Sequence, residues 1–125
     1  MASITLLGKE FPLEYTVQVM EEMTKRFGGT AEAVESMSSG DKQLENTIFL
    51  LSAMMKGAER RERVRCALWH EEYKGAEAPD YETLMQIMNP EDLRNMANCL
   101  IQAINEANMT TTELAPDAKK NEVTQ

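Results

Sequence analysis

The chain has little of what most catalytic and metal sites are built from. Its 125 residues include one histidine, two cysteines and one tryptophan. A zinc-metalloprotease helix needs two histidines four residues apart, whereas His70 stands alone in an acidic stretch. The sequence offers no further histidine that could activate Cys66 or Cys99 as a nucleophile. We therefore expect both cysteines to behave as small apolar core residues.

Phosphate-binding loops and paired acid–base groups are missing as well. Neither G-x-x-x-x-G-K-[ST] nor G-x-G-x-x-G occurs. The adjacent acids Glu21–Glu22, Glu71–Glu72 and Glu91–Asp92 would point in different directions on a helix, which makes them poor acid–base pairs. We expect no enzymatic activity, no catalytic residue, no cofactor and no metal. A small metal-dependent hydrolase around His70 is the weakest alternative.

Long apolar runs are also missing, and the net charge argues against two classes of partner. Thirteen basic and 21 acidic residues give a net charge of −8, which repels nucleic acids and anionic membranes. No apolar run approaches the roughly 18 residues of a membrane-spanning helix, and the N-terminus lacks a signal-peptide pattern. We expect a cytoplasmic protein that binds neither nucleic acid nor membranes.

The first 15 residues predict a β-hairpin. The β-prone run 4–7 and the alternating run 10–15 flank a turn at Gly8-Lys9. Pro12 cannot donate a backbone hydrogen bond, so the second strand should lie at an edge or end early.

Residues 16–109 predict a helical domain of four to six helices, so the fold class is mainly α (α+β) with one globular domain over residues 1–109. Helix N-caps are expected at Thr16, Thr30, Asp41, Asp80 and Asn89. Helix ends are expected at Gly28, near Ser38, at Gly57 and at Tyr73, with a separate helix running from Arg60 to Tyr73.

The last predicted helix has the clearest pattern. Pro90 follows the Asn89 cap, and the apolar stripe continues through Leu100, Ile101 and Ile104, which we expect to be structural. Residues 110–125 are polar and include Pro116, which predicts a disordered C-terminal tail.

Ten methionines are unusual beside so few aromatic residues. Core packing is the favoured interpretation, because methionine fills irregular gaps. The alternative is an adaptable groove for a partner helix, with Met20, Met23, Met54 and Met55 as candidate contacts.

Arg60, Arg61, Arg63 and Arg65 form a basic cluster in this acidic chain. Residues 41–75 carry seven basic and six acidic side chains, whereas both flanking regions are acidic. The favoured interpretation is a solvated helix face with Glu59 and Glu62 as local partners. The alternative is docking to an acidic segment. RNA binding ranks last, because no aromatic platform accompanies the arginines.

The order of these features resembles the tail assembly chaperones of long-tailed bacteriophages, especially those of Gram-positive hosts. The resemblance covers roughly residues 3–108. It is carried by the opening ITLLGKEFPL, the Thr16 helix that ends at Phe27-Gly28, and the final helix that begins Asn89-Pro90-Glu91-Asp92-Leu93.

The resemblance implies a chaperone that binds and solubilises the long helical tape measure protein in the host cytoplasm before the tail tube polymerises. Such a protein is absent from the mature virion, and the tail tube protein is a second candidate partner. Self-association would supply avidity along the tape measure protein, with the hairpin edge as a candidate contact. The alternative function is a cytosolic helical adaptor or regulator that docks an acidic partner through the Arg60–Arg65 face.

The C-terminal residues add one further feature to the resemblance. Many of these chaperones are made in a short and a long form by a −1 ribosomal frameshift. Lys119-Lys120-Asn121 can be encoded by an A-AAA-AAC slippery heptamer at the matching place. An ordinary solvated tail is the alternative interpretation.

Overall fold

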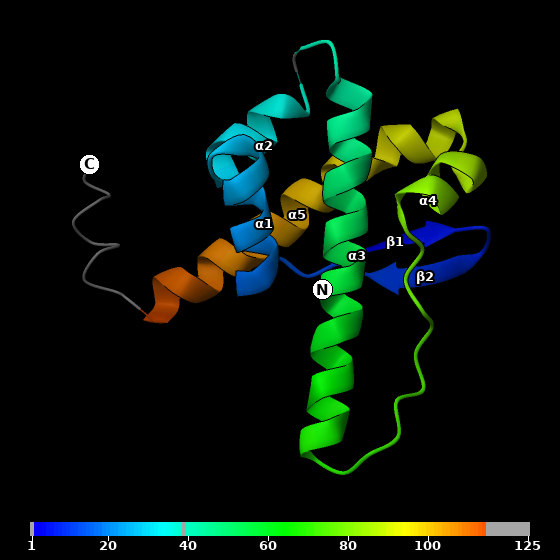
Figure 1. The fold of residues 1–125 in the computed structure, drawn as a ribbon, viewed down its shortest axis with the longest axis vertical. Coiled ribbons are helices and arrows are strands. Elements are labelled where there is room, and N and C mark those ends of the chain that lie inside the picture. Colours follow the sequence, from blue (N-terminus) through cyan, green and yellow to red (C-terminus); the bar gives the residue numbers. More distant parts are fainter. Residues whose placement is uncertain (1, 39, 115–125) are drawn as a thin grey trace.

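A two-stranded hairpin and five helices make up the part of the chain that the computed structural model describes, which is residues 2–38 and 40–114, with side chains as far as residue 108 (Figure 1). This arrangement confirms the predicted fold class. The longest helix, α3 (Gln43–Leu68), runs the height of the molecule, and the other elements surround its first half (Figure 1).

The hairpin consists of β1 (Ser3–Leu6) and β2 (Lys9–Pro12), which pair antiparallel with Leu6 opposite Lys9. Leu7 and Gly8 form the two-residue turn, and both have positive φ, as tight hairpin turns require. The second strand ends at Pro12, as predicted. Ile4 and Leu6 are buried, because β1 packs against the last helix and β2 against α3.

The first two helices follow directly. In α1 (Val17–Phe27), the Thr16 hydroxyl accepts from the Val19 amide at 3.2 Å, and Gly28 ends the helix in the left-handed conformation, which confirms both predicted boundaries. Next, α2 (Thr30–Ser36) has Gly29 at its N-cap, so the prediction of a Thr30 cap was one residue off.

The prediction that a helix ends at Gly57 was wrong, because α3 continues through this residue. A Cβ at position 57 would lie 2.7 Å from Cγ2 of Val19 and 3.3 Å from the carbonyl oxygen of Glu14. The glycine therefore lets α1 approach α3 closely and does not terminate the helix. The predicted Asp41 cap was also wrong, since Lys42 occupies the N-cap.

At its other end, α3 stops at Leu68, before the predicted Tyr73. The Glu71 amide donates to the Cys66 carbonyl at 2.7 Å, and the His70 amide donates to the Ala67 carbonyl at 3.4 Å. His70 has a φ of 59°. These bonds form a Schellman cap, in which the lone histidine takes the left-handed position usually given to glycine.

The last two helices are α4 (Tyr81–Ile87) and α5 (Pro90–Leu114). Asp80 and Asn89 cap them through their side chains, as predicted. The described backbone of α5 continues to Leu114, which includes the first five residues of the predicted tail, 110–114. Residues 115–125, which hold most of the predicted tail and the candidate frameshift residues Lys119, Lys120 and Asn121, lie outside the described residues.

The core forms where α3, α5, α1 and the hairpin meet. Leu100 and Ile104 of α5 are buried in it and Ile101 packs against it, which confirms their structural role. Within the described segments, no helix is both long and apolar enough to cross a membrane.

Candidate interaction surface

The two halves of α3 lie in different surroundings. Between Thr47 and Ala58, all residues except Phe49 and Lys56 are buried. Between Glu59 and Leu68, Cys66 alone is buried. We call residues 59–80 the arm: it consists of the second half of α3 and the extended segment that returns beside it to α4, and it projects below the rest of the molecule (Figure 1).

One side of the arm helix, its back face, is covered by the returning segment. The Ala78 amide donates to Oε1 of Glu59 at 2.8 Å. The guanidinium of Arg63 lies 4.2 Å from the centre of the Tyr73 ring, a cation–π contact. These contacts tie the extended segment to the helix.

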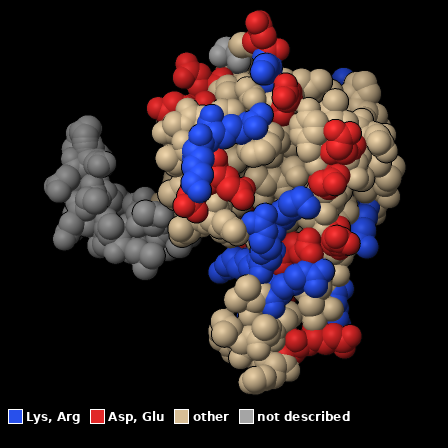
Figure 2. All heavy atoms as spheres, viewed as in Figure 1, with Lys and Arg blue, Asp and Glu red and all other residues tan. Residues whose placement is uncertain are grey.

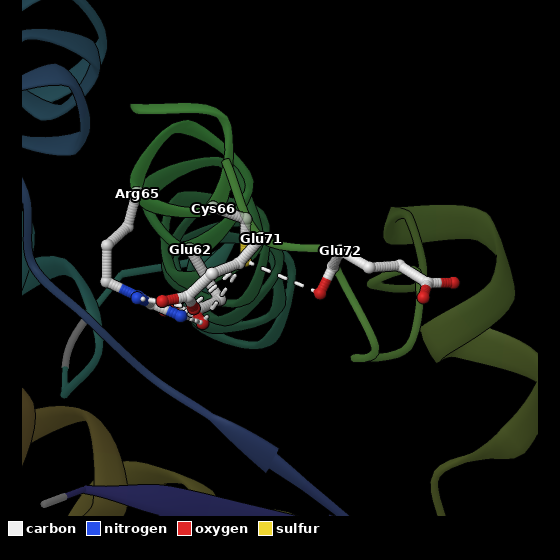
Figure 3. A network of polar contacts seen from close by, with 5 residues as sticks. All are labelled: Glu62, Arg65, Cys66, Glu71 and Glu72. Carbon is white, nitrogen blue, oxygen red and sulfur yellow. Dashed lines mark hydrogen bonds and ion pairs between the residues drawn. The ribbon is translucent and has the colours of Figure 1, made fainter. Parts of the chain in front are cut away.

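A polar network closes the end of the arm (Figure 3). Arg65 lies 2.6 Å from Oε2 of Glu62 and 3.0 Å from Oε1 of Glu71. The Cys66 thiol lies within 3.7 Å of Glu62 and 3.8 Å of the carbonyl oxygen of Glu72. The network joins three residues of the helix to two residues that follow its cap.

The thiol in this network is not activated as a nucleophile. Desolvation raises the pKa of Cys66, and the carboxylates of Glu62 and Glu71 add to this effect, whereas Arg65 opposes it. The thiol therefore stays protonated at neutral pH. Desolvation also raises the pKa of Cys99, which is half-buried in α5.

The four clustered arginines all have polar partners within the chain. Glu59 and Glu62 pair with Arg63 and Arg65, as the favoured interpretation of the sequence proposed. The other two reach the body of the molecule. Arg61 lies 3.0 Å from Glu14, and Arg60 donates to Gln18 at 2.6 Å and lies 3.8 Å from Glu22. Basic and acidic side chains accordingly alternate over this region (Figure 2).

The opposite side of the arm helix, its front face, carries exposed apolar side chains. At about 100° per residue, positions 57, 61, 64 and 68 fall on one side of α3. Val64 is 57% exposed and Leu68 is 66% exposed. Trp69, directly after the helix at the tip of the arm, is 63% exposed.

The front face leads into an open groove of about 800 Å³ at the base of the arm. We call this groove the notch. Its walls come from residues 13–18 and Met20, from the front face of α3, and from residues of α5 that include Ala103. Val17 is 81% exposed and Met20 is 43% exposed, so the wall contributed by α1 is apolar and accessible.

The structure corrects most of the methionine candidates. Met23, Met54 and Met55 are buried in the core and cannot touch a partner on the surface of this fold. Met20 alone of the four candidates is exposed, and it lines the notch.

Sequence reasoning did not predict that the apolar side chains of Val17, Val64, Leu68 and Trp69 would be exposed. The available signal was the i, i+4 pair of Val64 and Leu68 among arginines. Its meaning depends on whether another element covers that face, which the sequence does not reveal.

The described side chains include no group of three or more His, Cys, Asp or Glu residues placed to hold a metal ion. The accessible features of the site are apolar contact area and flanking charge, which suit binding to another protein. Comparison with known proteins gave no match among family models, curated proteins or solved structures.

Proposed function

We propose that this protein is a phage tail assembly chaperone that covers the apolar stripes of a long helical tape measure protein. The observation that supports this function is the front face of the arm together with the notch. Apolar side chains are exposed there in a row on an otherwise acidic protein. Exposed apolar side chains that gather around a groove are typical of interaction sites.

The shape of the surface suits a helix as the ligand. An amphipathic helix presents apolar side chains at i, i+3, i+4 and i+7, and such helices bind in grooves lined by other helices. Val17 and Met20 form one wall of the notch, and Val64 lies on another. Met20 adds a flexible contact that adapts to different side chains along a repetitive partner.

The alternative function, an adaptor that docks an acidic partner through Arg60, Arg61, Arg63 and Arg65, has less support. Each guanidinium already has a carboxylate neighbour within the chain. An acidic partner would have to compete with those carboxylates, and exposed ion pairs contribute little net free energy.

Co-expression tests the proposal. The wild-type chain should increase the soluble yield of the tape measure protein encoded nearby. The double variant Met20→Glu, Val64→Lys should lose this effect, because it places charges in the notch and on the front face. Met85→Lys is the matched control, since Met85 is similarly exposed on α4, away from the notch.

Two outcomes would contradict the proposed function. The first is an unchanged soluble yield of the tape measure protein when the wild-type chain is co-expressed. The second is a gene sequence that lacks both a slippery heptamer at codons 119–121 and a very long downstream gene for a helical protein.

A further inference from the structure

We infer that acid releases the segment that covers the back face of the arm, while the core of the molecule stays folded. We call this segment, residues 71–79, the strap. It runs from the tip of the arm back beside α3 to the start of α4 (Figure 1). The strap contributes no residue to the notch, so this inference does not rest on the proposed function.

Burial of apolar side chains contributes little to holding the strap. Ala78 is its only buried residue, and Cys66 is the only buried residue between positions 59 and 68 of the helix that it covers. A segment with so few buried contacts opens at a low free energy unless polar contacts hold it. The strap is therefore held mainly by its polar contacts with the helix.

Two of these polar contacts depend on a charged carboxylate. Oε1 of Glu59 accepts from the Ala78 amide at 2.8 Å, and Oε2 of the same residue lies 2.6 Å from Arg63. At the tip of the arm, Arg65 lies 3.0 Å from Oε1 of Glu71 (Figure 3). A carboxylate that becomes protonated loses its charge and accepts weaker hydrogen bonds. Acid therefore weakens the strap near both of its ends.

The titratable groups around Glu59 and Glu71 come from α3, from the strap and from the start of α4. They are Lys56, Glu62, Arg63, Arg65, Cys66, Tyr73, Glu77 and Asp80. From the first part of the chain, Glu14 and Glu22 reach the arm through Arg61 and Arg60. The cations among these groups favour the charged form of the carboxylates.

The direction of the pKa shifts agrees with this arrangement. Desolvation acts to raise the pKa of Glu59, but the bonds from the Ala78 amide and Arg63 lower it further. The hydrogen bond from Arg65 lowers the pKa of Glu62. Both charges therefore stabilise the arm at neutral pH. This contribution is lost as the pH falls below the ordinary value of 4.5 and through the lower pKa values of the folded state.

Protonation also changes the arm from nearly neutral to strongly cationic. Residues 59–80 carry five basic and six acidic side chains, a net charge of −1 with His70 neutral. With every carboxylate neutral, these 22 residues carry +5, whereas the other 103 residues carry +8. Like charges at this density repel one another and oppose a compact arrangement. The core resists the change because buried apolar side chains hold it, and their contribution does not depend on charge.

A pH titration of the full ¹⁵N-labelled chain, followed by NMR, tests the inference. We expect the amide of Ala78 to take the chemical shift of an unfolded chain between about pH 4.5 and pH 3, where carboxylates titrate. The amides of residues 47–58 should keep their native shifts over the same range. Fluorescence of Trp69, the single tryptophan, gives a second measurement at the tip of the arm. A strap that keeps its native shifts until the core unfolds, or a single transition for both, would overturn the inference.

Amide substitutions separate the loss of these two contacts from other effects of acid. The double variant Glu59→Gln, Glu71→Gln should speed hydrogen exchange of the Ala78 amide at pH 7 by about tenfold or more. Glu72→Gln, Glu77→Gln is the matched control, because it removes the same charge from the arm but neither contact. The carboxylate of Glu72 points away from Arg65 (Figure 3). We expect the control to exchange as the wild type does, and equal rates in the two double variants would contradict the inference.

Discussion

The two halves of α3 form one continuous helix but are stabilised in different ways. In the first half, residues 47–58 are buried on nearly all sides, and α1, α2, α4, α5 and β2 contact this helix. The second half carries four arginines and two glutamates, packs against one extended segment, and reaches the rest of the molecule through the side chains of Arg60 and Arg61. The comparison shows that burial on all sides holds the first half, whereas side-chain pairs and a single covering segment hold the second.

This difference predicts that the arm unfolds locally at a lower free energy than the rest of the molecule, which we call the body. Its helix has one buried residue, Cys66, and its ion pairs are largely exposed to solvent. Segments with few buried apolar contacts open locally at lower free energy than the core. Substitutions in the two halves should therefore differ in size and in the part of the chain that they affect.

The largest effect is expected from Leu50→Ala in the buried half. Leu50 is fully buried, so the change removes apolar contacts and leaves a cavity that costs about 3 kcal/mol. Urea unfolding at low protein concentration measures this loss. Val64→Ala on the arm is the matched variant and should change the free energy of unfolding by less than about 0.5 kcal/mol. Equal losses from both variants would contradict the comparison.

An intermediate effect is expected from Gly57→Ala, at the boundary between the halves. Alanine favours a helix over glycine by about 1 kcal/mol, so the exchange would be stabilising on a free helix surface. Here the new methyl group would lie 2.7 Å from Val19 and 3.3 Å from a backbone oxygen. Overpacking costs about 1–3 kcal/mol, so we expect a net loss of about 1 kcal/mol in thermal or urea unfolding. A gain in stability would show that α1 can move away.

A smaller and more local effect is expected from Glu59→Gln on the arm. Partial burial acts to raise the pKa of Glu59, but the Ala78 amide and Arg63 outweigh it and hold the pKa below 4.5. A lowered pKa in the folded state means that the charge stabilises the arm at neutral pH, and that this contribution is lost as the pH falls below the ordinary value of 4.5 and through the lower pKa of the folded state.

Hydrogen exchange resolves this effect by region. The variant should speed exchange in residues 71–78 at pH 7 by a few-fold, because a neutral amide binds Arg63 and the Ala78 amide more weakly. Exchange in residues 47–58 should not change. A uniform change across both regions would mean that the arm and the body open together.

Local sequence patterns predicted the ends of helices and strands correctly where one residue sets the backbone conformation. Thr16, Asp80 and Asn89 cap their helices as expected, since a side-chain oxygen three residues before an amide acts without help from the rest of the fold. Pro12 ends its strand for a similarly local reason.

The predictions failed where distant parts of the chain decide the outcome. Gly57 looked like a helix end, but its role is set by Val19, 38 positions earlier in the chain. Met23, Met54 and Met55 looked equivalent to Met20, but the first three are enclosed and the last is exposed. Neither distinction follows from the neighbouring residues.

The amino-acid sequence determined the hairpin, the mainly helical fold class and the starts of α1, α4 and α5, because hydrogen bonding and apolar periodicity act over a few residues. The tertiary structure decided that α3 continues through Gly57, that its second half projects as an arm, and that Val17, Met20 and Val64 line one open groove while Leu68 and Trp69 are exposed on the arm. The reason is geometric: whether an apolar side chain becomes core or contact surface depends on which other element covers it.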